Sequence, residues 1–500
     1  MFQYGIMPPA MFLGMIIFML YGFPVAFSLS AVGLFFGLLG IATGHFEFAF
    51  MQALPFRIFG IVSNDLLLAI PFFTFMGAIL ERCGLAEDLL EGTGKLFGAV
   101  PGGLAYAVIV VGAILGAITG TVAASVITMG VISLPIMLKY GYNSRLATGV
   151  IAASGTITQV IPPSLVLIVL ADQLGRSVGD MYLGAIGPSI LQVTIFMLFI
   201  LGLSIFRPKD VPPLPPEARG EMNMALVMKV LWGMVPSIVL IFLVLGTIFM
   251  GLATPTEAGA LGVVGAMAIA AMHRRLTWDL LRQGMHSTMT ITSMVVFILV
   301  GATCFSLVFQ GMDGGLWIEH LLSHVPGGAL GFLIFVNIFI FFLAFFLDFF
   351  EIAFIVIPML APVASALGID LIWFGVLLCI NMQTSFMHPP FGFALFYLRS
   401  IAPKSVKTKD IYLGAIPWLC MQLVLVAIVI FWPESVTYWL DKAPDVDLNT
   451  IKIEIPGFGN GGGNQMPNFG LPPMDGAPAQ PGQQGLPGMP NFGEPPKINP

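Results

Sequence analysis

Residues 141–163 read GYNSRLATGVIAASGTITQVIPP, and residues 368–390 read GIDLIWFGVLLCINMQTSFMHPP. The two stretches align without a gap, so that GYN aligns with GID and the two Pro-Pro pairs align with each other. The flanking motifs recur in the same order: VPGG begins at Val100 and Val325, and DMYLGAI and DIYLGAI begin at Asp180 and Asp410. The chain therefore carries one pattern of segments twice.

The composition is that of a membrane protein. Hydrophobic residues make up 57% of the 500 residues and charged residues 9%, whereas soluble domains have about 45–50% and about 25%. Many apolar runs reach the ~20 residues that a helix needs to cross the hydrocarbon. Two copies of one pattern, with helices interrupted at mid-membrane, are typical of secondary transporters. We predict an all-α polytopic membrane protein with two inverted repeats, two re-entrant helical hairpins and two broken helices, arranged as in elevator-type ion transporters.

Two further features limit the interpretation. The N-terminus lacks the basic segment and the cleavage site of a signal peptide, so we expect the first helix to be retained. Cysteines without paired spacing, in or near apolar runs, predict small core residues rather than disulfides or a metal site. These cysteines are Cys83, Cys304, Cys379 and Cys420.

Interruptions of the apolar runs divide the chain into segments. The last segment is rich in Gly, Pro, Asn, Gln and Met, which predicts disorder because it cannot bury enough apolar surface. The predicted segments are scaffold helices and an interfacial arm at 1–65; a first repeat at 66–206, with a hairpin at 102–139 and a broken helix at 146–171; a Pro-rich cytoplasmic linker at 207–227; scaffold and second-repeat helices at 228–311; a second repeat at 312–440, with a hairpin at 327–366 and a broken helix at 371–397; and the Gly/Pro-rich tail at 441–500.

The positions of Lys and Arg favour one orientation in the membrane. With the N-terminus outside, and with each hairpin entering and leaving on one side, 15 of the 20 Lys and Arg residues lie in inside loops. The same threading opens the first hairpin to the inside and the second to the outside, which is the predicted inversion. It also places the tail in the periplasm. The five residues left outside are Arg57, Arg176, Lys442, Lys452 and Lys497.

The first hairpin turns at GAITGTVAAS, residues 116–125, where small and hydroxyl residues gather. A helix that breaks inside a membrane frees carbonyl groups that need a partner. A cation can be that partner, while the N-terminus of the next half-helix favours an anion. A packing face of small residues is the alternative. The matching break in the helix that follows each hairpin favours a binding site, with Thr119, Gly120, Thr121 and Ser125 as candidate residues.

The two Pro-Pro pairs mark those breaks, and each follows a polar run. Proline removes a backbone donor and disfavours helix in the residue before it. Hydroxyl, amide and carbonyl oxygens suit a hard cation such as Na⁺. A structural kink would explain one pair, but two pairs at equivalent places favour two binding sites. The candidate ligands are Ser154, Thr156, Thr158 and Gln159 in the first run and Asn381, Gln383, Thr384 and Ser385 in the second.

Ionisable residues stand out in the apolar segments. Asp348 and Glu351 lie in LAFFLDFFEIAF, and because an Asp at mid-membrane costs about 2.5 kcal/mol or more on insertion scales, a role is expected. They could bind a cation or a proton, cap the second half-helix or contact the substrate. His388 could respond to protons, although a lone histidine beside a kink is more often only hydrogen-bonded. Glu257 is predicted to cap a helix start, and Arg145 to anchor its span on the inside.

The sequence contains no enzyme motif that would indicate catalysis. GTGK at Gly92 is an incomplete P-loop because Leu96 replaces the Ser or Thr, and neither HExxH nor GxSxG occurs. We therefore expect neither an enzyme nor a cofactor, and transport that draws on an ion gradient.

Long ordered motifs resemble the large membrane (M) subunit of the tripartite ATP-independent periplasmic (TRAP) transporters. The similarity covers about residues 1–440, and the hairpin tip has Thr119 and Thr121 where the family often has Ser. The motifs are LLLAIPFFTFMGAILERCGLAEDLL from Leu66, GAITGTVAASVITMG from Gly116, LPIMLKYGYNSRLATGVIAASGTITQVIPPS from Leu134 and FLDFFEIAFIVIPMLAPVASALGIDLIWFG from Phe346.

The resemblance implies a bacterial inner-membrane importer of small organic acids. Such a subunit works with a small four-helix membrane subunit and a periplasmic solute-binding protein, and it uses Na⁺ as the coupling ion, with protons the alternative. A 2-oxo acid or another monocarboxylate is the expected substrate. A stand-alone transporter without a binding protein remains possible, as does a channel, which would need a continuous polar pore.

The resemblance also implies an elevator, in which residues 82–206 and 312–409 slide against a scaffold. One Na⁺ site would join the tip at 119–121 to residues 154–159, and the other would join the Asp348 region to residues 381–385. The substrate would lie between the tips, in contact with Thr121, Ser125, Gln159, Glu351, Gln383 and His388.

Overall fold

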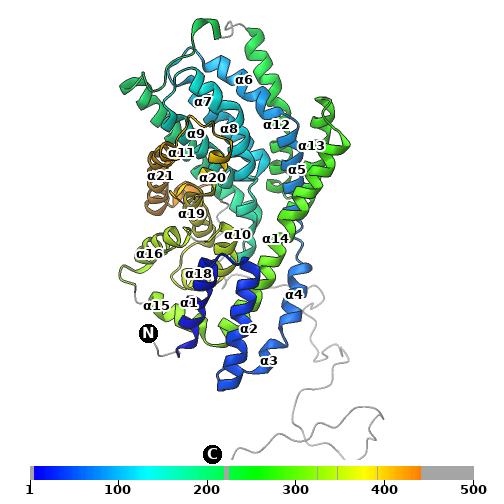
Figure 1. Ribbon diagram of the computed structural model, residues 1–500. Coiled ribbons are helices and arrows are strands. Elements are labelled where there is room, and N and C mark those ends of the chain that lie inside the picture. The colour runs from blue at the N-terminus through cyan, green and yellow to red at the C-terminus, as the bar shows by residue number, and fades with distance from the viewer. Residues whose placement is uncertain (1–4, 219–223, 324, 346, 391, 441–500) are drawn as a thin grey trace, which may run out of the picture. The chain divides into compact units, whose positions relative to one another are not determined.

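The structure is a computed structural model that describes residues 5–218, 224–323, 325–345, 347–390 and 392–440 (Figure 1). Within these ranges the regular elements are all helices. Seven of the described helices are long and apolar enough to cross a membrane. The predicted all-α polytopic membrane fold is therefore confirmed. The tail at 441–500, predicted to be disordered, lies outside the described residues.

The first apolar run forms two of the predicted scaffold helices. Gly22 has a φ of 77°, which favours glycine, and Pro24 occupies the N-cap position of the second helix. The predicted interfacial arm corresponds to two short helices. The elements are α1 (Met7–Leu20), α2 (Val25–Thr43), α3 (Phe48–Met51), α4 (Leu54–Val62) and α5 (Ala69–Arg82).

The first repeat contains both predicted interruptions. One lies at Gly120 and the other at Pro162-Pro163, which is a cis peptide bond. The amphipathic helix α6 was not predicted, because its charged residues interrupt the apolar run. The elements are α6 (Leu85–Phe97), α7 (Gly103–Thr119), α8 (Val122–Lys139), α9 (Ser144–Thr156), α10 (Leu165–Leu174) and α11 (Val178–Phe206).

The first part of the predicted linker packs against the base of the first hairpin. The N–H of Gly102 donates to the carbonyl of Val211 at 2.9 Å, and the N–H of Leu214 donates to the carbonyl of Gly98 at 2.9 Å. The side chains of Val211 and Leu214 are buried. This part of the chain is therefore held by the first repeat.

The second half has the same succession of elements. A capping box begins α13: the N–H of Thr254 donates to Glu257 Oε2 at 2.8 Å, which confirms the predicted cap. A π-helical turn at Ile352–Val356 joins α17 to α18. The elements are α12 (Met224–Phe249), α13 (Pro255–Met272), α14 (Trp278–Gly311), α15 (Gly314–Ser323), α16 (Gly328–Leu343), α17 (Phe349–Glu351), α18 (Ile357–Ala366), α19 (Leu371–Gln383), α20 (Phe393–Ile401), α21 (Thr408–Phe431) and α22 (Glu434–Thr437).

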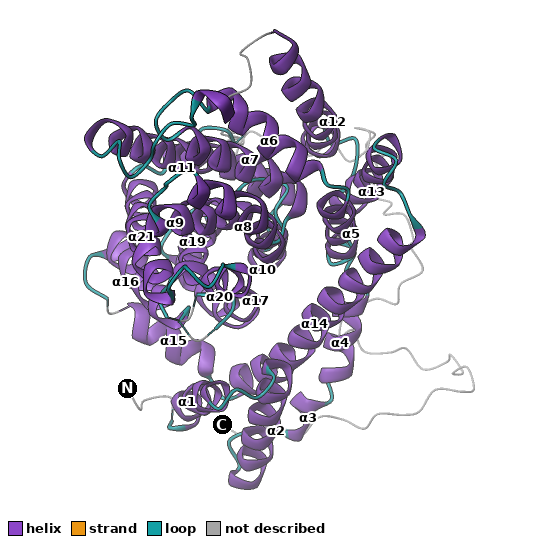
Figure 2. Ribbon diagram, turned by 45° about the horizontal axis from the view of Figure 1, so that its top comes forward, coloured by secondary structure: helices purple, strands orange, loops and turns teal. Residues whose placement is uncertain are grey.

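The broken helices pack in matching ways in the two repeats. In the first, Gly414 of α21 lies against the carbonyl of Arg145 in α9. In the second, Gly184 of α11 lies against Ile372 of α19, and an added Cβ there would be 3.1 Å from Ile372 Cγ2. Gly184 and Gly414 are the glycines of the two YLGAI motifs. Figures 1 and 2 show α9, α11, α19 and α21 gathered together, with α5, α12, α13 and α14 along another side.

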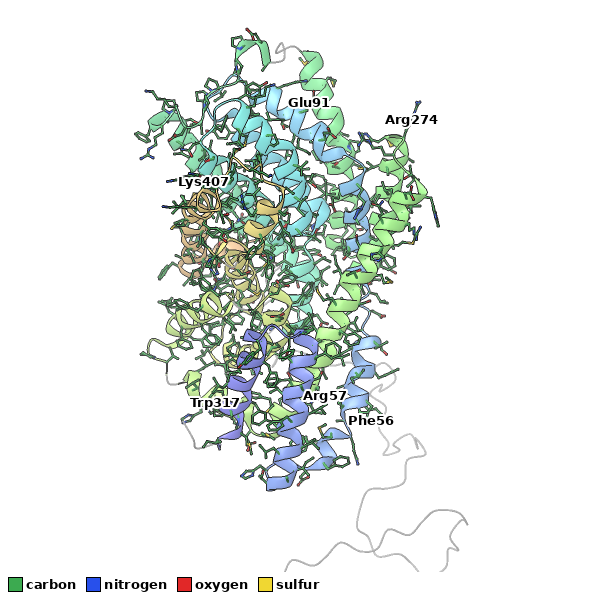
Figure 3. The ribbon with its side chains drawn as sticks, viewed as in Figure 1. Phe56, Arg57, Glu91, Arg274, Trp317 and Lys407 are labelled. Atoms are coloured by element: carbon green, nitrogen blue, oxygen red, sulfur yellow. The ribbon has the colours of Figure 1, made fainter. Side chains whose placement is uncertain are left out.

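Charged residues in predicted inside and outside loops lie in different halves of the helical unit formed by residues 5–440. Figure 3 shows Arg274 and Lys407, both in predicted inside loops, in the upper half of the view, and Arg57, predicted to lie outside, in the lower half. This arrangement agrees with the predicted threading. The assignment of either end to the cytoplasm stays a prediction.

Candidate functional site

The first break in the membrane helices is the tip of the hairpin formed by α7 and α8. Gly120 ends α7 with a φ of 61°, and Thr121 is extended at the N-cap position of α8. Ser125 is buried one turn into α8. The tip therefore places a left-handed glycine and the exposed N–H groups of a helix start side by side. The side chain of Thr119 lies outside the described residues.

The second break follows in the α9–α10 helix. A 3₁₀ turn at Ile157–Gln159 follows α9, and Ser164 caps α10 by accepting from Val166 N at 3.2 Å. The Ser164 hydroxyl also donates to the carbonyl of Gln159. The side chains of Thr158 and Gln159 in this turn are buried. The turn therefore places polar side chains in the protein interior.

The α19–α20 helix breaks in the same way. A 3₁₀ turn at Thr384–Met387 follows α19, the Pro389-Pro390 bond is cis, and the N–H of Gly392 donates to the carbonyl of His388 at 2.6 Å. Thr384 and Ser385 are buried. Thr384 Oγ1 donates to the carbonyl of Asn381 at 2.6 Å, so this hydroxyl is already hydrogen-bonded.

A buried contact joins the two broken helices. Gln383 Nε2 donates to Thr156 Oγ1 at 3.3 Å, and Gln422 Nε2 of α21 donates to the same oxygen at 3.1 Å. The Thr156 hydroxyl donates in turn to the carbonyl of Ala153 at 2.9 Å. A hydroxyl has one donor and two acceptor positions, so Thr156 Oγ1 is saturated. Its predicted role as a cation ligand would require one of these bonds to open.

Other polar atoms at the breaks have no hydrogen-bond partner among the described residues. Buried polar groups are nearly always hydrogen-bonded, and each exception needs an explanation such as an ion or water. Ser154 and Asn381, which the alignment places at the same position of the two repeats, both belong to this group. The unpartnered oxygens in and beside the predicted site are Ser154 Oγ, Gln159 Oε1, Asn381 Oδ1, Gln383 Oε1 and Gln422 Oε1.

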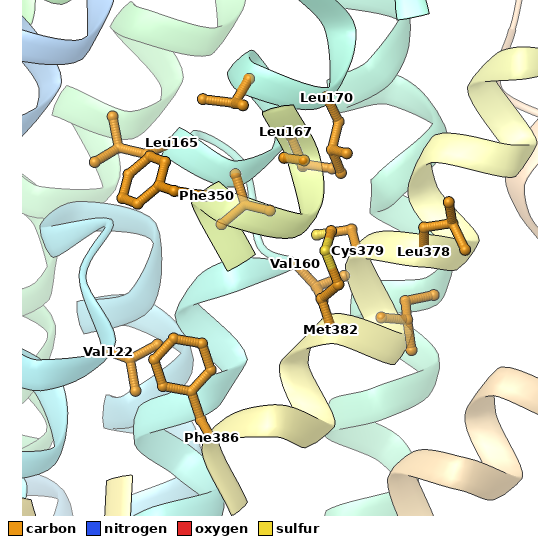
Figure 4. Close-up of a cluster of buried hydrophobic side chains, with 14 of the residues drawn as sticks. Val122, Val160, Leu165, Leu167, Leu170, Phe350, Leu378, Cys379, Met382 and Phe386 are labelled. Carbon is orange, nitrogen blue, oxygen red and sulfur yellow. The ribbon is translucent and has the colours of Figure 1, made fainter. Parts of the chain in front are cut away.

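Apolar side chains surround these polar groups. Figure 4 shows a buried cluster drawn from both repeats, including Val122 at the first tip, Val160, Phe350, Cys379 and Phe386. Cys379 Sγ lies 3.3 Å from the carbonyl of Gln159, so α19 contacts the break of the first repeat. An oxygen without a partner is costly in such surroundings, which favours a bound ligand there.

Asp348 and Glu351 form the cap of the second half-helix. The carboxylate of Asp348 accepts from Phe349 N at 2.7 Å, and Glu351 Oε2 accepts from Asp348 N at 3.0 Å. Together they make a capping box at the start of α17. Of the roles considered for these residues, the structure shows the cap. Contact with an ion or substrate stays a prediction.

His388 lies in an aromatic environment. Its ring stacks on Phe345 and meets Phe341 edge-on, with both centroid distances 4.2 Å. Neither ring nitrogen has a hydrogen-bond partner among the described residues. Both roles considered for this histidine, a response to protons and a hydrogen bond alone, therefore stay predictions.

Arg145 has a partner in the second repeat. Its Nε donates to Asp410 Oδ1 at 2.9 Å, which joins the first residues of α9 to those of α21. The guanidinium is exposed, so this pair contributes little to stability. A position at the helix end agrees with the predicted anchor.

Three buried polar residues at or near the site were missed in the sequence. Asn337 of α16 accepts a hydrogen bond from Asn381, and Gln422 donates one to Thr156. Gln192 of α11 matches Gln422 in position after the YLGAI motif, and its amide has no partner among the described residues. The available signal was a single amide in a long apolar run, as in FLIFVNIFIFFL around Asn337.

Comparison with known proteins agrees with this architecture. The family model of the tripartite ATP-independent periplasmic transporter, DctM component, matches residues 12–435. The chain belongs to this family. It is a TRAP transporter large permease, so the predicted resemblance is confirmed.

Similar proteins include two TRAP permeases with stated substrates. The C4-dicarboxylate TRAP transporter large permease protein DctM of Pseudomonas aeruginosa is 29% identical over 386 residues, which are 77% of this chain and 88% of that protein. The sialic acid TRAP transporter large permease protein SiaM of Vibrio cholerae is 27% identical over 414 residues, 83% of this chain and 93% of that protein. The YdaH transporter of Alcanivorax borkumensis has a similar fold, with a TM-score of 0.57, 14% identity and coverage of 77% and 88%.

Proposed function

We propose that this permease imports a small organic acid across the bacterial inner membrane, driven by a Na⁺ gradient. A periplasmic solute-binding protein delivers the acid, and a small membrane subunit completes the complex. Membership of the TRAP family and the carboxylate substrates named for similar permeases support this reaction.

The observation that carries Na⁺ coupling is the pair of unpartnered oxygens at equivalent places. Ser154 Oγ and Asn381 Oδ1 are buried, lack partners among the described residues, and each precedes a Pro-Pro break by the same distance in the sequence. Broken helices in transporters coordinate ions with unwound carbonyls. Neutral oxygens suit Na⁺, so we assign one Na⁺ site to each break. Binding there would satisfy the oxygens and hold the turns in shape.

The organic acid would bind between the tips of the two hairpins. The helix start at Thr121 offers N–H groups and a positive dipole end to a carboxylate. His388 adds two unpartnered ring nitrogens at the opposite break. The apolar cluster of Figure 4 would contact the part of the acid beyond its carboxylate. This arrangement suits an acid with an apolar body.

Alternating access would occur by sliding of the repeats against the scaffold. The loop at Asp65 is tied to the scaffold because Thr256 Oγ1 donates to the carbonyl of Asp65 at 2.7 Å. Asn64 Nδ2 of the same loop donates to Asp172 Oδ1 at the end of α10, at 2.7 Å. This hydrogen bond crosses between the two proposed bodies and would break during a transport stroke.

Thermal unfolding of the full-length protein with its small subunit tests the proposal. The melting temperature is measured in NaCl and in choline chloride at equal ionic strength. A ligand at ~100 times its dissociation constant adds about 2.7 kcal/mol of stability, so we expect a clear Na⁺-specific rise. Equal melting temperatures in the two salts would contradict Na⁺ coupling. Uptake into proteoliposomes without the binding protein would favour a stand-alone transporter.

A further inference from the structure

Asn337 is a buried amide in an apolar helix. It lies in α16, the first arm of the second hairpin, and 5% of it is exposed. Its Nδ2 donates to the carbonyl of Leu333 one turn earlier, at 2.8 Å. An amide in such a helix is expensive to keep within a membrane, so its contact with the next helix needs an explanation.

Asn337 holds the side chain of Asn381. The Nδ2 of Asn381 donates to Asn337 Oδ1 at 2.9 Å and to the carbonyl of Asn337 at 2.7 Å. Both protons of Asn381 can be used in this way, so its amide plane is fixed. Asn381 Oδ1, the other polar atom of this amide, has no partner among the described residues. The free oxygen is thus held in place by a residue outside the broken helix.

In the first repeat, the contact between the hairpin and the broken helix is made by different residues. Gly112 lies nine positions after the first residue of α7, as Asn337 does in α16. Gly112 packs directly on Ser154, the counterpart of Asn381, and an added Cβ would lie 2.7 Å from Ser154 Cβ. In the first repeat the hairpin therefore packs on Ser154 through a glycine. In the second repeat the hairpin contacts its broken helix through the side chains of Asn337 and Asn381.

We infer that Asn337 is the positioning residue of the second Na⁺ site, and that the first site has no counterpart of it. Asn337 does not bind the ion but orients Asn381 Oδ1 toward it. This inference rests on the proposed Na⁺ coupling. Residues that orient the ligands of a metal typically change its affinity 10–100-fold when they are replaced.

Na⁺ titration of Asn337→Ala tests the inference. Thermal unfolding of the full-length protein with its small subunit is followed against NaCl, with choline chloride keeping the ionic strength constant. We expect the half-saturating Na⁺ concentration to rise about tenfold. In Ser154→Ala, which impairs the first site, adding Asn337→Ala is expected to raise the half-saturating concentration of the remaining Na⁺ response about tenfold.

Val336→Ala is the matched control, because Val336 is fully buried beside Asn337 in the same helix. It is expected to lower the melting temperature in both salts and to leave the half-saturating concentration unchanged. Should Asn337→Ala fail to fold, Asn337→Ser takes its place, since its hydroxyl stops one bond short of Oδ1. The inference is overturned if the Asn337 variant titrates like the unmodified protein, or if Val336→Ala shifts the titration equally. Absence of any Na⁺ response in the unmodified protein would instead overturn the proposed function.

Discussion

Gln383 Nε2 donates a hydrogen bond of 3.3 Å to Thr156 Oγ1, and these two residues occupy the same position in the two repeats. A pseudo-two-fold axis that relates the two repeats places Thr156 of one at the position of Gln383 of the other. Two equivalent residues can touch only if both lie close to that axis. The two broken helices therefore meet at the centre of their pseudo-symmetry. Any movement of one break against the other must disturb this bond.

The Thr156 hydroxyl stabilises the junction of the broken helices. Thr156→Val keeps the shape but leaves two buried amide N–H groups, from Gln383 and Gln422, without their acceptor. Each lost partner costs about 1–3 kcal/mol, so for two partners we expect a loss of about 2–6 kcal/mol, equal in NaCl and choline chloride. Thr156→Ser, which retains the hydroxyl, is the control for thermal unfolding. A Na⁺-specific loss would instead make Thr156 an ion ligand.

Ser154→Ala should separate ion binding from folding. Ser154 Oγ has no hydrogen-bond partner among the described residues, so its removal costs no bond in the ion-free protein. We expect an unchanged melting temperature in choline chloride and a smaller rise in NaCl. Ser204→Ala is the control, because Ser204 Oγ donates to the carbonyl of Pro101 at 2.8 Å, away from the breaks. It should cost about 1 kcal/mol in both salts; an undiminished Na⁺ response in Ser154→Ala would exclude Ser154 as a ligand.

Asp348 is expected to act as a helix cap. Asn caps a helix about as well as Asp, whereas replacement by Ala costs about 0.5–2 kcal/mol. Asp348→Asn should therefore retain the melting temperature and the Na⁺ titration, and Asp348→Ala should lower the melting temperature in both salts. Both variants are compared by thermal unfolding. A tenfold loss of Na⁺ affinity in Asp348→Asn would show that the charge binds the ion.

The helix breaks could be predicted from the sequence because their causes are local. Proline pairs and crowded small residues interrupt a helix wherever they lie, so the breaks at Gly120 and Pro162 were found. The partners of polar side chains depend on tertiary packing. Nothing local to Thr156 shows that two amides from other helices saturate it, and nothing local to Asn337 shows that it faces Asn381. The candidate ligands were therefore identified by residue type, while their hydrogen-bond states required the structure.

The hydrogen bond from Asn64 to Asp172 should favour the state described here. It joins a loop tied to the scaffold to the end of α10, whereas the Arg145–Asp410 pair joins α9 to the start of α21 and involves no scaffold residue. Losing a bond worth about 1 kcal/mol changes an equilibrium about fivefold. We expect Asn64→Ala to enlarge a second distance population between spin labels at Phe56→Cys and Arg176→Cys, with Cys420, the exposed cysteine, replaced by Ser. Asp410→Asn should leave the distribution unchanged. One identical distribution in all three proteins would mean that this bond does not join two bodies that move apart.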